Sequence, residues 1–363
     1  MATNETLVPS PTPEPETIVS NDVSTAVGTL ILTLVFLVGV PGNLFVIWSI
    51  LVRARKRSVT CLLILHLALA DGGLMLLTLF FVVYLAKRSW VFGTAMCKGL
   101  FYLCCTNMYA SIFLITLMSL HRLVAVVRPH RLHLINRKAV VAPVLAALWV
   151  LTLAMAVPAL VFRQDTVNKE AGRGNDTRVC VPVHPREWQV VFQYTFETVV
   201  GFVLPYAAIV ASYVRILRRI RRTRFRRRVR SETLILAIVI TFGLFWLPYH
   251  VVNIIQVAAV LSKEPTKTQL DHVWKTSRAV TSSLAFISSC ANPVLYSVAA
   301  RGYIHQAGLG FMAQLFEGTA PDSGTYRGRA GNALSRQASR EKVGLDSLKD
   351  READSSTSTS QGK

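Results

Sequence analysis

Charged residues are scarce in this chain, which narrows the class of protein at once. Only 17% of its 363 residues are Asp, Glu, Lys or Arg, while 52% are hydrophobic. A soluble domain has a more even balance, so the composition predicts long segments that lie in lipid. The stretch 97–127 lacks any acidic residue. A helix of that length, rising about 1.5 Å per residue, is long enough to cross a bilayer.

Cysteine is too sparse to build a disulfide scaffold. The chain has six cysteines, and four of them lie within apolar segments. Cys97 and Cys180 lie at segment ends or in loops, so they are the candidates for a bridge. The four cysteines in apolar segments are Cys61, Cys104, Cys105 and Cys290.

Basic residues are absent before Arg53 and concentrated later in the chain. The formal net charge of +20 is a value that nucleic-acid-binding proteins also reach. However, ten of the 40 basic residues are arginines between Arg215 and Arg230, immediately after an apolar segment. Basic residues that flank membrane segments mark the cytoplasmic side. The pattern predicts a plasma-membrane protein with an extracellular N-terminus and no nucleic-acid partner.

Seven apolar segments of transmembrane length follow one another along the chain. An odd number of crossings places the C-terminus inside, together with every large basic cluster. The predicted fold class is an all-α membrane protein, a seven-transmembrane helix bundle over residues 26–298. The segments lie near 26–52, 59–86, 97–127, 140–162, 188–217, 233–261 and 270–298.

The segments outside the predicted bundle are polar or amphipathic. Residues 1–25 are rich in proline and predict a disordered extracellular tail. Residues 301–316 predict an amphipathic helix on the inner membrane surface, in contact with lipids, although Gly308 and Gly310 weaken it. Residues 317–363 predict a disordered cytoplasmic tail, either regulatory or merely solvated. Glycosylation is expected at Asn4 and Asn175, and phosphorylation at Ser339, Ser355, Ser356, Thr357 and Ser358.

Several polar side chains lie deep in the apolar segments, where each needs a partner or a task. Asp71 is a carboxylate among hydroxyl and amide groups at similar expected depth, which suits a bound sodium ion. A structural hydrogen-bond network is the alternative, and the two do not exclude each other. Pro205, Pro248 and Pro293 each remove a backbone hydrogen bond. They produce either static kinks or points at which a helix switches between two arrangements. The polar set comprises Asn43, Asp71, Ser111, Ser288, Ser289 and Asn292.

Together these motifs resemble the rhodopsin-like G-protein-coupled receptors. The resemblance implies a Cys97–Cys180 disulfide and a ligand pocket open to the outside. It also implies a G protein that docks at an inner cleft when the sixth helix swings outward. Arg122, Tyr213 and Tyr296 match the residues that rearrange in that swing. The matching motifs are Leu67-Ala-Leu-Ala-Asp71, Arg122 closing the third segment, Trp149, Phe242 to Pro248, and Asn292-Pro-Val-Leu-Tyr296.

Two further absences constrain the ligand. No Asp or Glu lies between Lys98 and Leu120, so the third helix lacks the carboxylate that amine receptors use. The seventh segment has no lysine beyond Lys275, so retinal has no anchor. Arginines at the rim and aromatic residues below them favour an anionic amphiphile, unless the arginines only anchor the helices at the interface. The expected ligand-binding residues are Phe101, Met108, Tyr109, Arg163, Glu197, Trp246, His250, Asn253 and Arg278.

A second resemblance, to the leukotriene B4 receptors, is more specific. It implies a dihydroxy fatty acid as ligand, inhibitory G proteins as the main partners, and chemotaxis and inflammation as the outcome. Receptor kinases and arrestin would act on the tail. At the first turn of the third helix the high-affinity subtype has histidine where this chain has Phe101, so related hydroxy fatty acids stay open as agonists. The similar motifs include Met108-Tyr-Ala-Ser111, Phe196-Glu197, Trp246-Leu-Pro-Tyr-His-Val-Val-Asn253 and Phe316-Glu-Gly318.

Other function classes fit the sequence less well. A secondary transporter would show paired, inverted repeats with broken helices, and no such pairing is visible. A membrane enzyme would need a catalytic or metal-binding cluster, whereas His66, His121 and His250 lie on separate segments without ligand spacing. The sequence therefore predicts a receptor without enzymatic activity. The remaining alternative is a receptor for another acidic lipid or for a chemoattractant peptide.

A departure from the family pattern generates a first prediction. The family usually has Asp or Glu before the arginine that closes the third helix, whereas His121 precedes Arg122 here. Because this acidic partner of the resting state is missing, we expect more ligand-free signalling from this chain than from its His121→Asp variant. The measurement is ligand-independent G-protein activation at matched surface level. Equal basal signalling in the two proteins would disprove the idea.

Overall fold

The computed structural model describes residues 22–54, 58–168, 177–222 and 229–299, all within one compact unit of the chain. Several predicted features lie outside these residues. They are most of the tail 1–25, the membrane-surface helix 301–316, the tail 317–363, the arginines 226–228, the glycosylation positions Asn4 and Asn175, and the phosphorylation positions Ser339 and Ser355 to Ser358.

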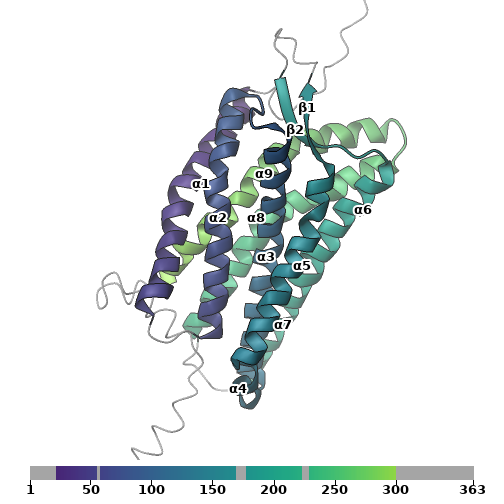
Figure 1. Ribbon diagram of the computed structural model, residues 1–363. Coiled ribbons are helices and arrows are strands. Elements are labelled where there is room, and N and C mark those ends of the chain that lie inside the picture. Colours follow the sequence, from purple (N-terminus) through teal and green to yellow (C-terminus); the bar gives the residue numbers. More distant parts are fainter. Residues whose placement is uncertain (1–21, 55–57, 169–176, 223–228, 300–363) are drawn as a thin grey trace, which may run out of the picture. The chain divides into compact units, whose positions relative to one another are not determined.

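Long helices make up nearly all of the described chain (Figure 1). Two π-turns, Ser49–Arg53 and Val199–Val203, and one short 3₁₀ turn, Pro129–Arg131, adjoin them. The predicted segments match these helices closely, because long apolar runs have few alternatives to a helix in lipid. The helices are α1 Asp22–Trp48, α2 Val59–Lys87, α3 Gly93–Val127, α4 Leu132–Ile135, α5 Lys138–Phe162, α6 Glu187–Thr198, α7 Leu204–Arg222, α8 Val229–Leu261 and α9 Thr266–Ala299.

The all-α prediction needs one correction, because the connection after α5 contains two strands. Strand β1, Arg163–Asn168, pairs antiparallel with β2, Thr177–Pro182, and Asp165 lies opposite Cys180. Val167, Val179 and Val181 supply the β-branched side chains that favour a strand. In a segment this short, the surrounding polar residues outweighed the strand preference of these valines, so no strand was predicted.

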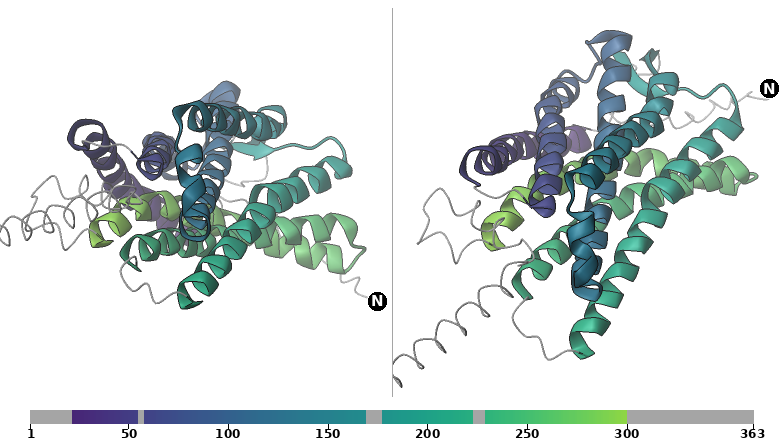
Figure 2. Two further views of the ribbon diagram at one scale, coloured as in Figure 1. Left: turned by 90° about the horizontal axis from the view of Figure 1, so that it is seen from below. Right: turned by 60° about the horizontal axis from the view of Figure 1, so that its bottom comes forward.

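Within the described chain, six helical segments are long and apolar enough to cross a membrane. They correspond to the first six predicted segments. The seventh, α9, has 34 residues but carries many Ser, Thr and basic residues, so its mean hydropathy is lower. It nevertheless packs along α8 and α1 (Figure 2). Among its polar side chains Ser288 and Asn292 are buried, while Lys275 and Thr276 nearer its start are exposed.

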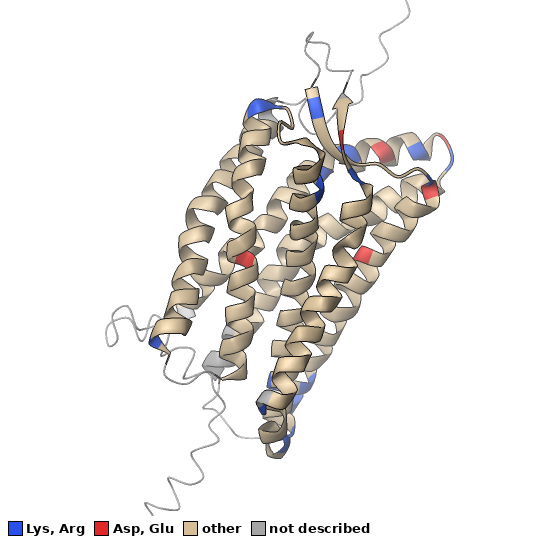
Figure 3. Cartoon of the chain, in the orientation of Figure 1, with Lys and Arg blue, Asp and Glu red and all other residues tan. Residues whose placement is uncertain are grey.

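Apolar side chains cover the outside of the helices as well as the inside. Val150 and Leu244 are each exposed over about two thirds of their surface, at 68% and 66%. Lys and Arg gather at the two ends of the helices, and the middle is almost entirely free of charge (Figure 3). An uncharged middle band with charged ends is the surface that a bilayer requires.

Helix α3 is the central packing element, because it contacts α2, α5, α7, α8 and β1. Its side chains Ile112, Ile115 and Met118 are buried to 0–1% exposure. The end of α3 that holds Cys97 is called the disulfide end of the bundle below, and the end that holds Arg122 is called the arginine end.

The fifth predicted segment is divided into α6 and α7 by the π-turn Val199–Val203. Pro205 follows this turn and has no backbone N–H, so the carbonyl of Gly201 loses its regular helical donor. The π-turn is wider than a regular helical turn, so it accommodates the missing hydrogen bond to the Gly201 carbonyl. Gly201 also lies directly against the ring of Tyr109, where any Cβ would collide with ring carbons.

This close approach generates the second prediction. We expect Gly201→Ala to destabilise the bundle by about 1–3 kcal/mol, because overpacking moves Tyr109. The measurement is the midpoint temperature of the detergent-solubilised protein. Gly73→Ala is the matched control, since a Cβ at Gly73 meets nothing within 4 Å. A Gly201→Ala protein as stable as the Gly73→Ala protein would contradict the packing argument.

Candidate ligand-binding site and polar networks

A cavity of about 350 Å³ opens within the disulfide end of the bundle. Helices α1, α2, α3, α8 and α9 form its walls, strand β2 and Arg163 cover it, and Tyr194 of α6 closes one side. The volume lies near the lower end of the range for small-molecule sites. Most of the lining is apolar, so the few polar side chains determine which ligand fits.

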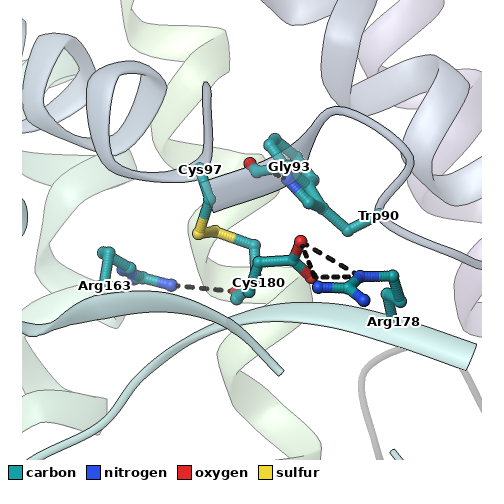
Figure 4. Close-up of a disulfide and its surroundings, with 7 residues drawn as sticks. Trp90, Gly93, Cys97, Arg163, Arg178 and Cys180 are labelled. Atoms are coloured by element: carbon teal, nitrogen blue, oxygen red, sulfur yellow. Dashed lines mark hydrogen bonds and ion pairs between the residues drawn. A yellow bond between two sulfur atoms is a disulfide. The ribbon is translucent and has the colours of Figure 1, made fainter. Parts of the chain in front are cut away.

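The cover of the cavity is fixed by the disulfide between Cys97 of α3 and Cys180 of β2 (Figure 4). This bond confirms the predicted pair. Arg163 donates from Nη1 to the Cys180 carbonyl over 3.3 Å, and its guanidinium lies 3.5 Å from the centre of the Phe101 ring. The cation–π contact and the carbonyl position the guanidinium without neutralising it.

An ion pair within the hairpin and hydrogen bonds to the connection between α2 and α3 keep the hairpin in place. Arg178 makes a bidentate ion pair with Asp165, and this pairing raises the pKa of Arg178. The Trp90 backbone N–H donates to the Arg178 carbonyl over 2.8 Å. The fully buried Trp90 ring donates to the Gly93 carbonyl over 2.9 Å (Figure 4). The hairpin is therefore secured at the disulfide and at Trp90.

His184 follows the hairpin and lies beside the cavity cover. One ring nitrogen, Nε2, is 2.7 Å from Oε1 of Gln193, and the ring lies 4.6 Å from that of Phe162. Burial lowers the pKa of His184 and the nearby charge of Arg163 lowers it further, while the hydrogen bond to Gln193 acts in the opposite direction.

Arg278 of α9 provides the second cation of the cavity. Its guanidinium donates to the amide oxygens of Asn253 and Gln256 on α8. Three aromatic rings surround it, those of Tyr194 at 5.1 Å, Tyr249 at 5.3 Å and Trp274 at 5.8 Å. The ion pairs among the described residues are Arg178–Asp165 and Lys267–Glu187, so neither Arg163 nor Arg278 has a direct carboxylate partner there.

Glu197 is connected to Arg278 through an amide. Asn253 donates from Nδ2 to the Glu197 carboxyl over 3.1 Å and accepts from Arg278 on its oxygen. Glu197 is only 3% exposed. Glu197 was predicted as a ligand-binding residue, and in the structure its carboxyl accepts a hydrogen bond from Asn253.

The predicted ligand-binding residues fall into two groups. Five of them line the cavity directly: Phe101, Met108, Arg163, Trp246 and Arg278. Glu197 and Asn253 lie behind Arg278 as its support. Tyr109 packs against Gly201, and His250 lies 3.3 Å from the Thr198 hydroxyl and stacks on Phe202.

Four cavity residues around Arg278 were missed by the sequence analysis. Gln256 lies three positions after Asn253 on α8, so a helical count from Asn253 places it on the same face. Tyr249 lies four positions before Asn253 for the same reason. Tyr194 and Trp274 come from other helices, and no pattern in the sequence relates them to α8. The four residues are Tyr194, Tyr249, Gln256 and Trp274.

A polar network surrounds Asp71 in the middle of the bundle. The carboxyl accepts from Asn292 at 2.8 Å, from Asn107 at 3.1 Å and from Ser111 at 3.3 Å. Asn43 does not reach it in this arrangement, because it donates to the carbonyls of Gly39 and Ser289. Asn107 was missed because the sequence analysis selected Ser111 alone from this part of α3.

The donor set around Asp71 fits a small cation as well as a structural network. Amide oxygens of Asn43 and Asn107 are buried without a hydrogen-bond partner in the described chain. Oxygen ligands of this kind, together with one carboxylate, are what a hard cation such as sodium binds. No cluster of three or more His, Cys, Asp or Glu side chains lies among the described residues.

Trp246 connects the cavity with this network. It lines the cavity and donates from Nε1 to the Ser288 hydroxyl over 3.0 Å. Ser288 adjoins Ser289, whose carbonyl accepts from Asn43. A ligand that displaces the Trp246 ring therefore acts directly on a hydrogen bond of the buried polar groups.

At the arginine end, the residues predicted to rearrange are buried. Arg122 is 7% exposed, Tyr213 7% and Tyr296 1%. Arg122 is enclosed by the helices at this end of the bundle. Its neighbour His121 lies with Nε2 at 2.9 Å from Oδ1 of Asn136, which follows α4. The atypical His121 thus joins α3 to the connection between α3 and α5.

Comparisons with known proteins agree with this geometry. The sequence pattern of the 7 transmembrane receptor (rhodopsin family) matches residues 42–296. Human leukotriene B4 receptor 1 is 43% identical over 299 residues, which are 82% of this chain and 84% of that protein. Human leukotriene B4 receptor 2 is 40% identical over 325 residues, 88% of each chain. Rat somatostatin receptor type 1 is 34% identical over 280 residues, 74% of this chain and 67% of that protein.

The family match covers α2 to α8, most of α9, both cysteines of the disulfide and the polar network around Asp71. Members of this family are receptors and not enzymes. The chain is therefore a multi-pass membrane receptor that belongs to the 7 transmembrane receptor (rhodopsin) family.

Proposed function

We propose that this chain is a plasma-membrane receptor for leukotriene B4 that activates inhibitory-type G proteins and so drives chemotactic and inflammatory signalling. The observation that carries the proposal is a pair of guanidinium groups, Arg163 and Arg278, in an otherwise apolar cavity. Neither forms an ion pair among the described residues. Both relatives at about 40% identity bear the name of this ligand.

The surroundings of Arg278 leave it ready to bind an anion. Asn253 and Gln256 are neutral acceptors, so they orient the guanidinium but leave its charge in place. A cation removed from water is costly unless an anion joins it. A ligand carboxylate would compensate for that cost through two parallel N–H···O bonds, for which the planar guanidinium is well shaped.

The remaining surface of the cavity suits a hydrocarbon chain with a few hydroxyls. Phe81, Met108, Trp246 and Phe286 contribute apolar area. Tyr194, Tyr249 and Gln256 contribute groups that bond a hydroxyl. A dihydroxy fatty acid combines these two kinds of surface with a carboxylate, whereas a cationic amine has no carboxylate partner on α3.

Signalling would proceed from the cavity to the arginine end. Trp246 responds to the ligand and bonds Ser288, and the Asp71 network follows on the same helices. An outward swing of α8 would then expose Arg122 and Tyr213 to the G protein. Receptor kinases and arrestin would act on the C-terminal tail, which lies outside the described residues.

A second candidate function is a receptor for another hydroxy fatty acid, another acidic lipid or a chemoattractant peptide. The observation that favours it is Phe101, which occupies the position beneath Arg163 with an apolar ring. A polar side chain there would bond one more ligand oxygen. The similarity to a somatostatin receptor keeps peptides among the alternatives.

The third prediction concerns agonist and coupling. In cells that express this chain, leukotriene B4 should inhibit forskolin-stimulated cyclic AMP at nanomolar concentration, and pertussis toxin should abolish the response. The methyl ester should be weaker because it cannot pair with a guanidinium. Silence at micromolar ligand, with surface expression verified, would reject the ligand and direct the search to other hydroxy fatty acids and acidic chemoattractants.

The fourth prediction concerns Arg278. We expect Arg278→Ala to weaken agonist potency about a hundredfold, because truncating one partner of a buried charge pair costs roughly 2–5 kcal/mol. If Arg278 binds the carboxylate, the same substitution should remove most of the difference between the acid and its methyl ester. Lys275→Ala is the matched control, since Lys275 is exposed one turn away on the same helix. A difference between acid and ester that persists in Arg278→Ala would assign the carboxylate to Arg163 instead.

A further inference from the structure

The cavity extends beyond its polar end into a space between α1, α2 and α9. Here its lining consists of side chains from these three helices. This apolar arm is lined by Val27, Gly28, Ile31 and Leu32 of α1, Tyr84 and Leu85 of α2, and Ala279, Val280 and Ser283 of α9.

The apolar arm offers almost no hydrogen-bonding capacity. Leu32 is 3% exposed and Tyr84 7% exposed, so both belong to its buried wall. The Ser283 hydroxyl donates to the Ala279 carbonyl over 2.9 Å, which is a bond within α9. A polar group would be desolvated in the arm without compensation, whereas a hydrocarbon chain would not.

A row of aromatic rings joins the arm to the arginine at the cover. Phe286 lies 5.8 Å from Phe81, Phe81 lies 5.4 Å from Phe101, and Phe101 carries the guanidinium of Arg163. Along this row the surface changes from cationic to apolar. An amphiphile whose acid lies between the two guanidinium groups of the cavity, those of Arg163 and Arg278, would lay its hydrocarbon chain on these rings and point its far end into the arm.

The arm reaches the outer surface of the bundle. Val27 is 47% exposed and Val280 is 48% exposed, yet both line the cavity. The cavity therefore borders side chains of α1 and α9 that are only about half buried.

The packing of α1 against α9 changes along the two helices. A Cβ at Gly39 would lie 3.2 Å from Cys290 of α9, and one at Gly42 would lie 2.9 Å from Pro293 of α9. A Cβ at Gly28 would meet only Leu85 of α2 within 4 Å, and nothing from α9. The two helices are thus in close contact at Gly39 and Gly42, whereas beside the cavity Gly28 packs toward α2 and not toward α9.

We propose that the hydrocarbon end of an acidic lipid occupies the apolar arm, and that this ligand enters from the bilayer between α1 and α9. The cover, which is secured by the disulfide and by Arg163, lies over the polar end. An anionic amphiphile dissolved in the leaflet at the disulfide end already has its chain at the depth of Val27 and Val280. This inference rests on the proposed function only in taking the ligand to be an acidic lipid.

Photochemical labelling tests the position of the hydrocarbon end. The probe is a long-chain carboxylic acid with a diazirine at its methyl end, added to the full-length receptor in nanodiscs. After irradiation, mass spectrometry maps the labelled peptides. We expect adducts on α1 near Val27 and on α9 near Val280, and we expect leukotriene B4 to compete with them.

Each outcome of the labelling is informative. Adducts confined to Met108 and Trp246, at the floor of the cavity, would overturn the arm as the site of the hydrocarbon end while leaving the proposed ligand intact. Adducts in the arm that leukotriene B4 does not displace would support the arm and reject the proposed ligand. The absence of saturable labelling would overturn both.

A pair of substitutions tests the route of entry. Val280→Trp fills the opening, while Val294→Trp places the same side chain at an equally exposed position of α9, 48% exposed, that does not line the cavity. We expect Val280→Trp to slow both labelling by the probe and its release by about fivefold or more, because a ligand that needs an opening motion binds slowly. Val294→Trp should label and release at the wild-type rate. Wild-type rates in Val280→Trp would overturn lateral entry.

Discussion

The need to bond every backbone N–H and C=O inside the chain determines most of this structure. A bilayer supplies no water to these groups, so long apolar segments must be helical. Where proline breaks the pattern, the structure compensates locally, as the π-turn Val199–Val203 does before Pro205. The same requirement applies to buried side chains, and it explains why Asp71 has three side-chain donors around it. The bundle orients Arg163 and Arg278 without neutralising them. These two cations therefore give the clearest indication of function.

The sequence predicted the helices well because their signal is local. The segment expected at 59–86 is helical over Val59–Lys87, and the one expected at 140–162 over Lys138–Phe162. The Cys97–Cys180 bridge was also foreseen, because the other cysteines lie in apolar segments. The strands β1 and β2 were missed, since their pairing joins two short segments that are separated along the chain. Helix α9 was also predicted, although its mean hydropathy is low. It packs against α8 and α1, and a helix in contact with other helices need not be apolar along its whole length.

The candidate site was predicted less completely, for a physical reason. Arg163 and Arg278 stand out in a sequence with few charges, so composition alone draws attention to them. Their partners are contributed by several helices, and the packing that unites Tyr194 of α6 with Trp274 of α9 around one guanidinium leaves no trace in either segment. The distinction between residues that line the cavity and residues that support the lining is likewise three-dimensional. Asn253 and Glu197 belong to the second kind, which the sequence could not separate from the first.

The ring beneath Arg163 has a consequence for signalling in an acidic medium. Phe101 has no proton to gain or lose, and burial disfavours the protonated form of the neighbouring His184. Of these two side chains only His184 can gain a proton, and its lowered pKa moves that step to lower pH. A receptor with a histidine in place of Phe101 would acquire a second, pH-dependent cation there. Under the proposed function, the phenylalanine adds no titrating group beneath Arg163, so a fall in pH at this corner would act through His184 and through the carboxyl group of the ligand.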